Sequence, residues 1–312
     1  MECCVDKSRS KFSKPALTIE QQVDLLVSRG LKIDNREVAS HYLRFIGYYR
    51  LSAYCIPFQY CEASGDNHQF KPYVSFEQVL DLYIFDRKLR LLIMDAVERI
   101  EVAIKAAISN VASVDYGSHW FLMKEPFKTS EASKKNKKTF NHANWLIKLK
   151  KDVEENKSDI FIQHYMRHYD DPELPPSWMI FETLSLGTVS LIYKSLESGL
   201  QKKIAGLFSV PYRILESWLH TMSYLRNLCA HHSRIWNRTF TIKPKILKEY
   251  RNHVSQNNMF FAQVFVIIRL LRKISQDSHW EERLEHLLEE HPKVDRSRMG
   301  FPEDWMALPV WE

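Results

Sequence analysis

The chain has 312 residues, of which 45% are hydrophobic, and a formal net charge of +6. This length allows one large domain or two small ones, and the apolar content is sufficient for a sizeable core. Glycine is scarce, with 8 residues, which argues against an all-β chain or a dinucleotide-binding fold with many tight turns. The mild basic excess is compatible with a nucleic-acid partner.

Cysteine usage and the apolar runs both indicate a cytoplasmic protein. The chain has 5 cysteines without any C-x-x-C spacing, so we expect reduced thiols and neither a disulfide framework nor a zinc site. The first ten residues do not resemble a signal peptide. The longest apolar run, residues 260–271, is interrupted by Gln263 and Arg269 and is too short to span a bilayer, so we expect no membrane partner.

Two capping signals predict a pair of helices in a small N-terminal unit, residues 1–60. The first helix follows Thr18–Gln21, which has the pattern of a capping box, and ends near Gly30. The second helix follows the similar signal Asp34–Glu37 and stops at Gly47.

A block of aromatic and basic side chains follows the second helix. Tyr48, Tyr49 and Arg50 are adjacent in the sequence. Aromatic rings interleaved with arginine can stack on unpaired RNA bases. They can equally pack the N-terminal unit against the rest of the chain, and the sequence leaves both interpretations open.

A third capping signal, Ser75 with Gln78, predicts a long helix over about residues 76–112. Apolar residues recur there at steps of three and four, which is the pattern of a helix with one face buried in a bundle. We expect this helix to pack against the central helix described below.

Residues 124–144 combine many lysines with serine, threonine and asparagine, which predicts a basic loop inserted in the bundle. Such a loop can be a solvated segment, or it can contact the phosphates of an RNA and make binding dependent on salt. The candidate RNA-binding side chains of this loop are Lys134, Lys135, Lys137 and Lys138.

The remaining pattern is helical, so we predict an all-α chain with a HEPN-like bundle over residues 75–290. Breaks are expected at the proline-rich residues 170–176 and at Gly187. An irregular aromatic tail, residues 291–312, is expected to dock on the bundle. Further helices are expected at residues 143–156, in the segment that follows up to residue 165, and in the segment that begins at Ser177. Others are expected at residues 201–208, 244–253, 258–275 and 280–290.

Residues 209–238 predict the central helix of the bundle. Ser209 is a suitable N-cap, Pro211 fits the first turn, and no other glycine or proline occurs before Pro244. On a helical wheel at about 100° per residue, one broad sector is apolar and the opposite sector is polar. The apolar sector is therefore expected to face the core.

The polar stripe of this helix contains the candidate catalytic residues. It includes Ser223, Asn227 and His231, at positions i, i+4 and i+8, with Arg226 beside them. The neighbouring His232 falls in the apolar sector, so we interpret it as a core or supporting histidine and His231 as the histidine for chemistry. This distinction depends on a straight helix.

The same spacing argues against a metal or cofactor site. Adjacent helical side chains point about 100° apart, and no Asp or Cys stands at ligand spacing near the two histidines. No phosphate-binding glycine loop or hydrolase motif is present, and we expect no cofactor.

Leu219 lies at the edge of the polar stripe, so we expect it to be exposed in one copy and covered by a second.

Arg226, Asn227 and His231 resemble the Arg-x4-6-His motif of HEPN domains, in which the residue after the arginine is commonly polar. The surrounding L-R-N-L-C-A-H-H-S-R-I-W-N-R resembles the Abi_2 family, the AbiD/AbiF-like abortive-infection proteins of bacteria. Other blocks along nearly the whole chain resemble the same family: K-P-A-L-T-I-E-Q-Q-V-D-L-L, H-Y-L-R-F-I-G-Y-Y-R-L-S-A-Y, L-Y-I-F-D-R-K-L-R-L-L, P-P-S-W-M-I-F-E-T-L-S-L-G-T and the closing G-F-P-E-D-W.

This resemblance implies a metal-independent endoribonuclease of phage defence that uses the 2′-hydroxyl of its RNA substrate. The arginine would bind the phosphate and the histidine would transfer protons. Two proton transfers are needed and each chain has one such histidine, so the resemblance implies a homodimer with a composite site. An arginine at an active site commonly has a carboxylate beside it, and Glu98 or Glu101 is a candidate. Some AbiF-like relatives are associated with a structured non-coding RNA, so RNA can also be a regulator.

Two other functions remain open from the sequence. The polar stripe can be the interface of a non-catalytic helical RNA-binding or adaptor protein. The chain can also be the toxin of a toxin–antitoxin pair that a partner protein silences. Cleavage of RNA by the purified protein in EDTA would distinguish the nuclease from the adaptor.

Overall fold

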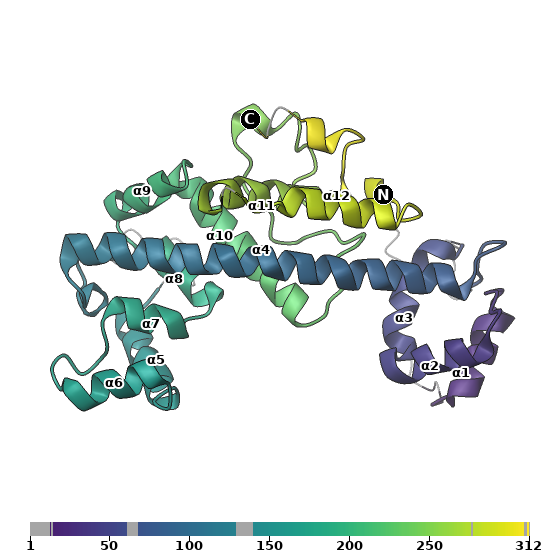
Figure 1. Cartoon of the computed structure of the whole chain (residues 1–312), viewed down its shortest axis with the longest axis horizontal. Coiled ribbons are helices and arrows are strands. Elements are labelled where there is room, and N and C mark those ends of the chain that lie inside the picture. Colours follow the sequence, from purple (N-terminus) through teal and green to yellow (C-terminus); the bar gives the residue numbers. More distant parts are fainter. Residues whose placement is uncertain are drawn as a thin grey trace. The chain divides into compact units, whose positions relative to one another are not determined.

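A computed structural model describes residues 13, 15–60, 68–128, 140–275, 277–308 and 311. The chain is all-α as predicted (Figure 1), and among the described residues β-type pairing is limited to isolated bridges. It divides into two compact units, Met1–Phe85 and Asp86–Glu312. In the part of the chain that is described, each helix is too short or too polar to cross a membrane.

Three short helices form the first unit, namely α1 (Ile19–Ser28), α2 (Arg36–Ile46) and α3 (Tyr48–Cys55). The predicted capping box opens α1, because Thr18 Oγ1 accepts the Gln21 N–H at 3.2 Å and Gln21 Oε1 accepts the Thr18 N–H at 2.8 Å. Asn35, rather than the expected Asp34, caps α2 by accepting the Val38 N–H at 3.0 Å. The buried centre of the unit includes Val23, Leu26, Ala39, Leu43, Leu51 and Tyr54.

The long helix α4 (Phe76–Tyr116) begins in the first unit and continues through the second. At its start, the Ser75 N–H donates to the Gln78 side chain at 3.0 Å, which confirms the predicted cap. Its apolar stripe is buried in the second unit, as the periodicity predicts. The buried residues of the stripe there include Leu89, Ile93, Ala96, Ile100, Ile104 and Ile108.

Five shorter helices follow, namely α5 (His142–Glu155), α6 (Ile160–His168), α7 (Ser177–Thr183), α8 (Leu186–Ser195) and α9 (Ser198–Leu207). The break between α7 and α8 falls before Gly187, because the Ser185 side chain caps α8 by accepting the Thr188 N–H at 3.3 Å. Gly187 lies inside α8, where an added Cβ would stand 3.2 Å from Oγ of Ser223. The glycine therefore lets α8 pack closely against the central helix.

The central helix, α10 (Tyr212–Ala230), is shorter at both ends than predicted. Pro211 precedes its first residue, and Ser209, the expected N-cap, instead has a φ of 53°. The helix ends at Ala230, so the expectation that it continues to residue 238 is wrong. Most of the predicted core face is buried, including Trp218, Met222, Leu225 and Cys229.

Two C-terminal helices, α11 (Phe260–Ile274) and α12 (Trp280–Glu290), lie close to their predicted bounds. Trp218 of α10 packs edge-on against Phe265 of α11, with ring centroids 6.0 Å apart. The helix predicted at residues 244–253 is wrong, because that segment contains one short 3-10 turn, Lys248–Tyr250. An irregular segment, residues 231–259, connects α10 to α11 instead.

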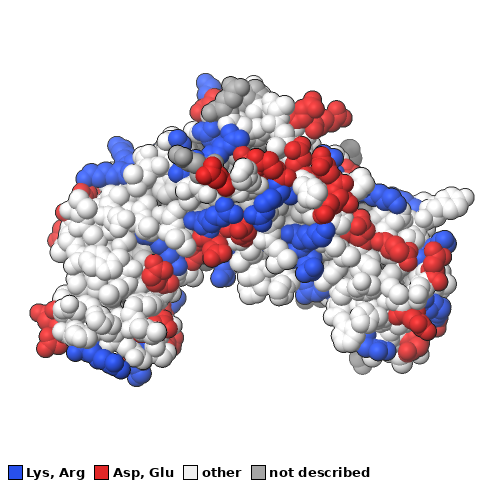
Figure 2. Space-filling model, viewed as in Figure 1, with Lys and Arg blue, Asp and Glu red and all other residues white. Residues whose placement is uncertain are grey.

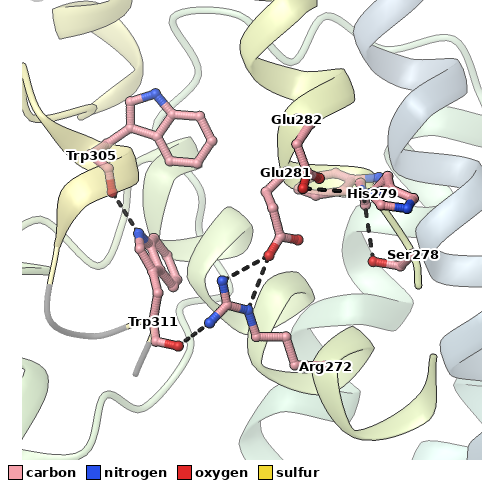
Figure 3. Close-up of polar contacts among 8 residues, drawn as sticks. Arg272, Ser278, His279, Glu281, Glu282, Trp305 and Trp311 are labelled. Carbon is pink, nitrogen blue, oxygen red and sulfur yellow. Dashed lines mark hydrogen bonds and ion pairs between the residues drawn. The ribbon is translucent and has the colours of Figure 1, made fainter. Parts of the chain in front are cut away.

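The aromatic tail docks on the second unit through one arginine (Figure 3). Trp305 and Trp311 are buried, and the Trp311 indole N–H donates to the Trp305 carbonyl at 2.6 Å. The Arg272 guanidinium of α11 donates to the Trp311 carbonyl and, at 2.9 and 3.0 Å, to the Glu281 carboxylate of α12. Arg272 therefore connects α11, α12 and the tail.

Charged side chains of α4 pair with charged side chains of α12, and acidic and basic groups lie next to each other on the face shown in Figure 2. Asp95 binds Arg99 at 2.6 Å and Arg283 at 2.9 Å, and Lys88 binds Glu290 at 2.9 Å. These pairs are largely solvent-exposed, so each stabilises the fold by less than about 1 kcal/mol. The pairs engage the basic side chains Lys88, Arg99 and Arg283, which are therefore not free to bind another partner.

Candidate functional site

α10 ends in a tight backbone turn that carries both histidines of the motif. His231 is the C-cap, and His232 has a φ of 54°. The His232 N–H donates to the Cys229 carbonyl at 3.0 Å, and the Ser233 N–H donates to the Leu228 carbonyl at 2.8 Å. These two bonds form a Schellman motif, in which the position of His232 is commonly occupied by glycine. The motif satisfies the last carbonyls of the helix and turns the chain away from its axis.

This turn changes the interpretation of the two histidines. His231 and His232 are both exposed, so the core position expected for His232 is wrong. The helical wheel does not apply beyond Ala230, because the helix ends there. Leu219 is fully buried, so the expectation that it lies on a surface between two copies is also wrong.

A buried aspartate of α4 holds the segment that follows the histidines. Asp86 is fully buried, and its Oδ1 accepts the backbone N–H groups of Ile235 at 3.0 Å and Trp236 at 2.7 Å. Its Oδ2 forms an ion pair with Arg90, which is 5% exposed. Asp86 therefore fixes the chain just after His231 to α4.

Arg226 lines an open hollow of about 470 Å³ along α4. Glu98 and Glu101 had been expected as carboxylates beside this arginine, and both line the same hollow. His231 and Asn227 do not line it and are exposed at the end of the helix. The full lining is Met94, Asp95, Val97, Glu98, Glu101, Val102, Lys105 and Arg226.

Glu101 and Lys105 form a largely buried ion pair in this hollow. The Lys105 ammonium lies 3.0 Å from the Glu101 carboxylate, and the two side chains are 10% and 19% exposed. Lys105 also donates to the Glu182 carbonyl at 3.5 Å, which connects α4 to α7. Because Glu101 is engaged by Lys105, the exposed Glu98 is the better candidate to orient Arg226.

Packing buries one residue of the polar stripe of α10 and leaves the others partly or fully exposed. Ser223 is buried next to Gly187, so the expected solvent-facing position of this serine is wrong. Arg226 is half-buried, and Asn227 and His231 are exposed as expected. Ser223 therefore belongs to the contact between α8 and α10.

Cys229, just before the histidines, is an unreactive thiol. Burial raises its pKa to about 12, and the nearby Arg90 charge lowers the pKa by less than burial raises it. The thiol therefore stays protonated at neutral pH, and it is free rather than disulfide-bonded. A cysteine nucleophile is not available at this position.

The lysines predicted to contact RNA lie outside the described residues, namely Lys134, Lys135, Lys137 and Lys138. In the first unit, the Tyr48 hydroxyl accepts a hydrogen bond from the Arg29 guanidinium at 2.7 Å. Tyr49 is 92% exposed, and Arg50 is also exposed. Of the two tyrosines, Tyr49 is the one whose ring is accessible to an RNA base.

The structure places the candidate residues on one helix but not in one cavity. Arg226 lines the hollow together with Lys105 and the acidic Asp95, Glu98 and Glu101, and His231 presents an accessible imidazole at the end of the same helix. Across the residues that the structure describes, no group of three or more His, Cys, Asp or Glu side chains is placed to hold a metal ion.

Sequence reasoning misses two residues of this region, Asp86 and Lys105. Each belongs to an acid–base pair at i, i+4 on α4, with Arg90 and Glu101 respectively. The spacing is visible in the sequence, but such pairs commonly lie on the surface. Both pairs hold parts of the fold together because other segments of the chain bury them, and no local sequence pattern indicates this burial.

Comparison with protein families gives a match to this region. The family described as Abi-like protein matches residues 41–237, which is more than half of the chain. This range contains α4, α10 and both histidines of the motif. No curated protein and no solved structure matches the chain.

Proposed function

Because the chain belongs to the Abi-like protein family, we propose that it is a metal-independent endoribonuclease of the HEPN type. Membership of this family suggests a role in abortive-infection phage defence. The observation that supports the reaction is the position of Arg226 in a charged hollow on the helix that ends at the exposed His231.

In the proposed reaction the RNA supplies its own nucleophile. His231 takes the proton of a 2′-hydroxyl, and that oxygen attacks the adjacent phosphorus. The bond from phosphorus to the 5′-oxygen breaks, and the leaving oxygen takes up a proton. The products are a 2′,3′-cyclic phosphate and a 5′-hydroxyl, and DNA is not cut because it lacks the nucleophile.

We assign to Arg226 the role of stabilising the negative charge that develops on the phosphorane. A guanidinium binds two phosphate oxygens at once, and it stays charged at any pH at which the enzyme is folded. Lys105 is held by Glu101, so the exposed Glu98 in the same hollow is the carboxylate that we assign to orient the guanidinium. Arg226→Lys keeps the charge but loses the bidentate geometry, so we expect cleavage to fall by about 10²-fold.

We further propose that two copies assemble around one composite site, because the reaction needs two proton transfers and each chain contributes one His231. Leu91 and Val102 of α4 are 59% and 58% exposed, and Val102 lines the hollow. These apolar side chains offer a surface that a second copy would cover. Sedimentation equilibrium at micromolar concentration tests the assembly, and a fully active monomer would contradict it.

The deciding experiment is cleavage of RNA by the purified protein in EDTA, with analysis of the product ends. We expect cleavage to persist and to leave 2′,3′-cyclic phosphate and 5′-hydroxyl ends. A single 2′-deoxyribose on the 5′ side of the cut should protect that bond. Products with 5′-phosphate ends, or cleavage that stops in EDTA, would contradict the mechanism.

The two adjacent histidines provide a matched pair of variants. His231→Ala is expected to lower cleavage by about 10²–10⁴-fold. His232→Ala removes an equally exposed imidazole one residue away and is expected to keep most of the activity. Equal losses in both variants would mean that His231 has no special role.

A non-catalytic RNA-binding protein is the second candidate. It is favoured by one observation, namely that the hollow contains Arg226 but not His231. In that case the protein would bind RNA without cutting it, and His231→Ala would leave binding unchanged. The EDTA experiment therefore separates the two functions.

A further inference from the structure

The segment between α10 and α11, residues 231–259, has an excess of basic residues, and we call it the strap. It contains six lysine or arginine residues and a single acidic residue, Glu249, which gives it a formal net charge of +5, compared with +6 for the whole chain. The strap begins at His231, so this charge starts at the candidate site.

The strap is held along α10 and runs antiparallel to it. Near its start, the Thr241 hydroxyl lies 3.3 Å from the Tyr224 hydroxyl. Further on, the Lys245 N–H donates to the Ser217 hydroxyl at 2.9 Å, and the Lys245 carbonyl accepts the Trp218 indole N–H at 2.9 Å. The strap therefore passes from the end of α10 back towards its beginning, over about 10 Å of helix.

Burial alternates along the middle of the strap. Pro244 and Ile246 are buried, whereas Lys243 and Lys245 are exposed. This alternation is that of an extended chain, in which every second side chain faces solvent. The two lysines are then about 6.6 Å apart along the chain, a step similar to that between successive phosphates of a polynucleotide.

Four basic side chains of the strap differ from several of those on α4 and α12, because within the described part of the chain they have no acidic partner. Among the described residues, no ion pair involves Lys243, Lys245, Lys248 or Arg251, and all four are exposed. Several basic side chains of α4 and α12 are engaged by acidic ones, whereas these four basic side chains of the strap remain available to a polyanion. Exposed lysines without acidic partners are available to neutralise the phosphates of an RNA backbone.

We propose that the strap is an RNA-binding track that holds the backbone of the substrate as it leaves the site of Arg226 and His231. Lys243, Lys245 and Lys248 contact successive phosphates, independently of base sequence. This inference rests on the proposed function for the identity of the ligand. The track is distinct from the hollow, because none of its lysines lines the hollow.

The test is the RNA affinity of a triple variant, Lys243→Gln with Lys245→Gln and Lys248→Gln, made in a His231→Ala background so that the RNA is not cut. Each phosphate contact to a single strand contributes about 0.7 to the slope of log affinity against log salt. We therefore expect the slope to fall by about 2 and the affinity at about 0.1 M salt to fall on the order of 10- to 100-fold. Fluorescence anisotropy with labelled single-stranded RNA measures both.

A control variant of equal charge change is available on α5, with Lys148→Gln, Lys150→Gln and Lys151→Gln. All three lysines are exposed. We expect this variant to keep most of the affinity and slope of the parent. An equal loss in both triple variants would overturn the track, because it would indicate only general charge attraction. Unchanged affinity and slope in the strap variant would also overturn it.

Failure of the track and failure of the proposed function give different results. A dinucleotide has one phosphate and, when bound at His231, cannot reach Lys243, Lys245 or Lys248, so its cleavage by otherwise native protein should be unchanged by the strap substitutions. If RNA is cleaved and the strap variant binds normally, the track is wrong and the nuclease stands. If no RNA is cleaved but the strap variant loses affinity, the nuclease is wrong and the track stands.

Discussion

Asp86→Ala is expected to destabilise the protein strongly, because one side chain makes three buried interactions. Asp86 pairs with Arg90 and accepts the backbone N–H groups of Ile235 and Trp236. Alanine would remove the carboxylate that Arg90 faces, and it would leave both N–H groups without this acceptor. The segment that follows His231 would then lose its attachment to α4.

The expected loss follows from the burial of these groups. Removing one member of a buried ion pair costs about 3–5 kcal/mol. Each buried donor left unsatisfied costs about 1–3 kcal/mol. These costs do not simply add, because the segment can shift and all three interactions involve the same side chain. We therefore expect a decrease of about 4–6 kcal/mol in the free energy of unfolding, which is a large part of a typical stability of about 5–15 kcal/mol.

Urea unfolding followed by circular dichroism measures this loss. Asp86→Asn keeps an oxygen for the two N–H groups but removes the charge, so we expect roughly half of the loss. Adding Arg90→Met to Asp86→Asn removes both charges and is expected to restore part of the stability. A loss below about 1 kcal/mol for Asp86→Ala would refute the proposal that this aspartate clamps the end of α10.

Three further predictions concern the same region. His232→Gly is expected to maintain stability or raise it by up to about 1 kcal/mol, because glycine adopts a φ of 54° without steric cost; a lower melting temperature would show that the imidazole makes contacts that outweigh this strain. Cys229 is expected to resist alkylation at pH 8 in the folded protein and to react in urea, because burial raises its pKa to about 12, and peptide mass spectrometry measures this. Since an unfolded thiol titrates near its ordinary pKa of 9.0, the stabilisation from the neutral Cys229 thiol is present below that pH and is lost as the pH rises towards 12. Lys105→Gln is expected to lower the free energy of unfolding by about 1–3 kcal/mol, because Glu101 would keep a largely buried carboxylate, whereas Lys151→Gln on exposed α5 should change it by less than about 1 kcal/mol.

The starts of α1 and α4 and the candidate Arg226–His231 motif are determined by residues close together in the sequence. The Thr18–Gln21 box opens α1 and the Ser75–Gln78 pair opens α4 where their patterns predict, because each cap is made within four residues. The spacing of Arg226 and His231 is likewise a local property. Hydrophobic periodicity also predicts the all-α class, since it depends only on the order of residues along each helix.

Pairs that become buried only through packing are not predictable in this way. Glu101 and Lys105 have the spacing of an ordinary surface ion pair, and nothing nearby in the sequence reports that other helices cover them. The segment at residues 244–253 has a helical pattern, yet Lys245 gives both backbone groups to side chains of α10. Tertiary contacts override the local preference there.

The end of α10 shows most clearly what the sequence alone determines and what the tertiary structure decides. Residues 231–238 contain no glycine or proline and continue the apolar pattern, so the sequence predicts a longer helix. The helix stops because Asp86, 149 residues before Ile235, accepts backbone N–H groups that a continuing helix would direct to its own carbonyls. A partner so distant in the sequence leaves no local signal. Only the packing of α4 against the end of α10 therefore exposes His232, places His231 at the helix end and directs the strap along α10.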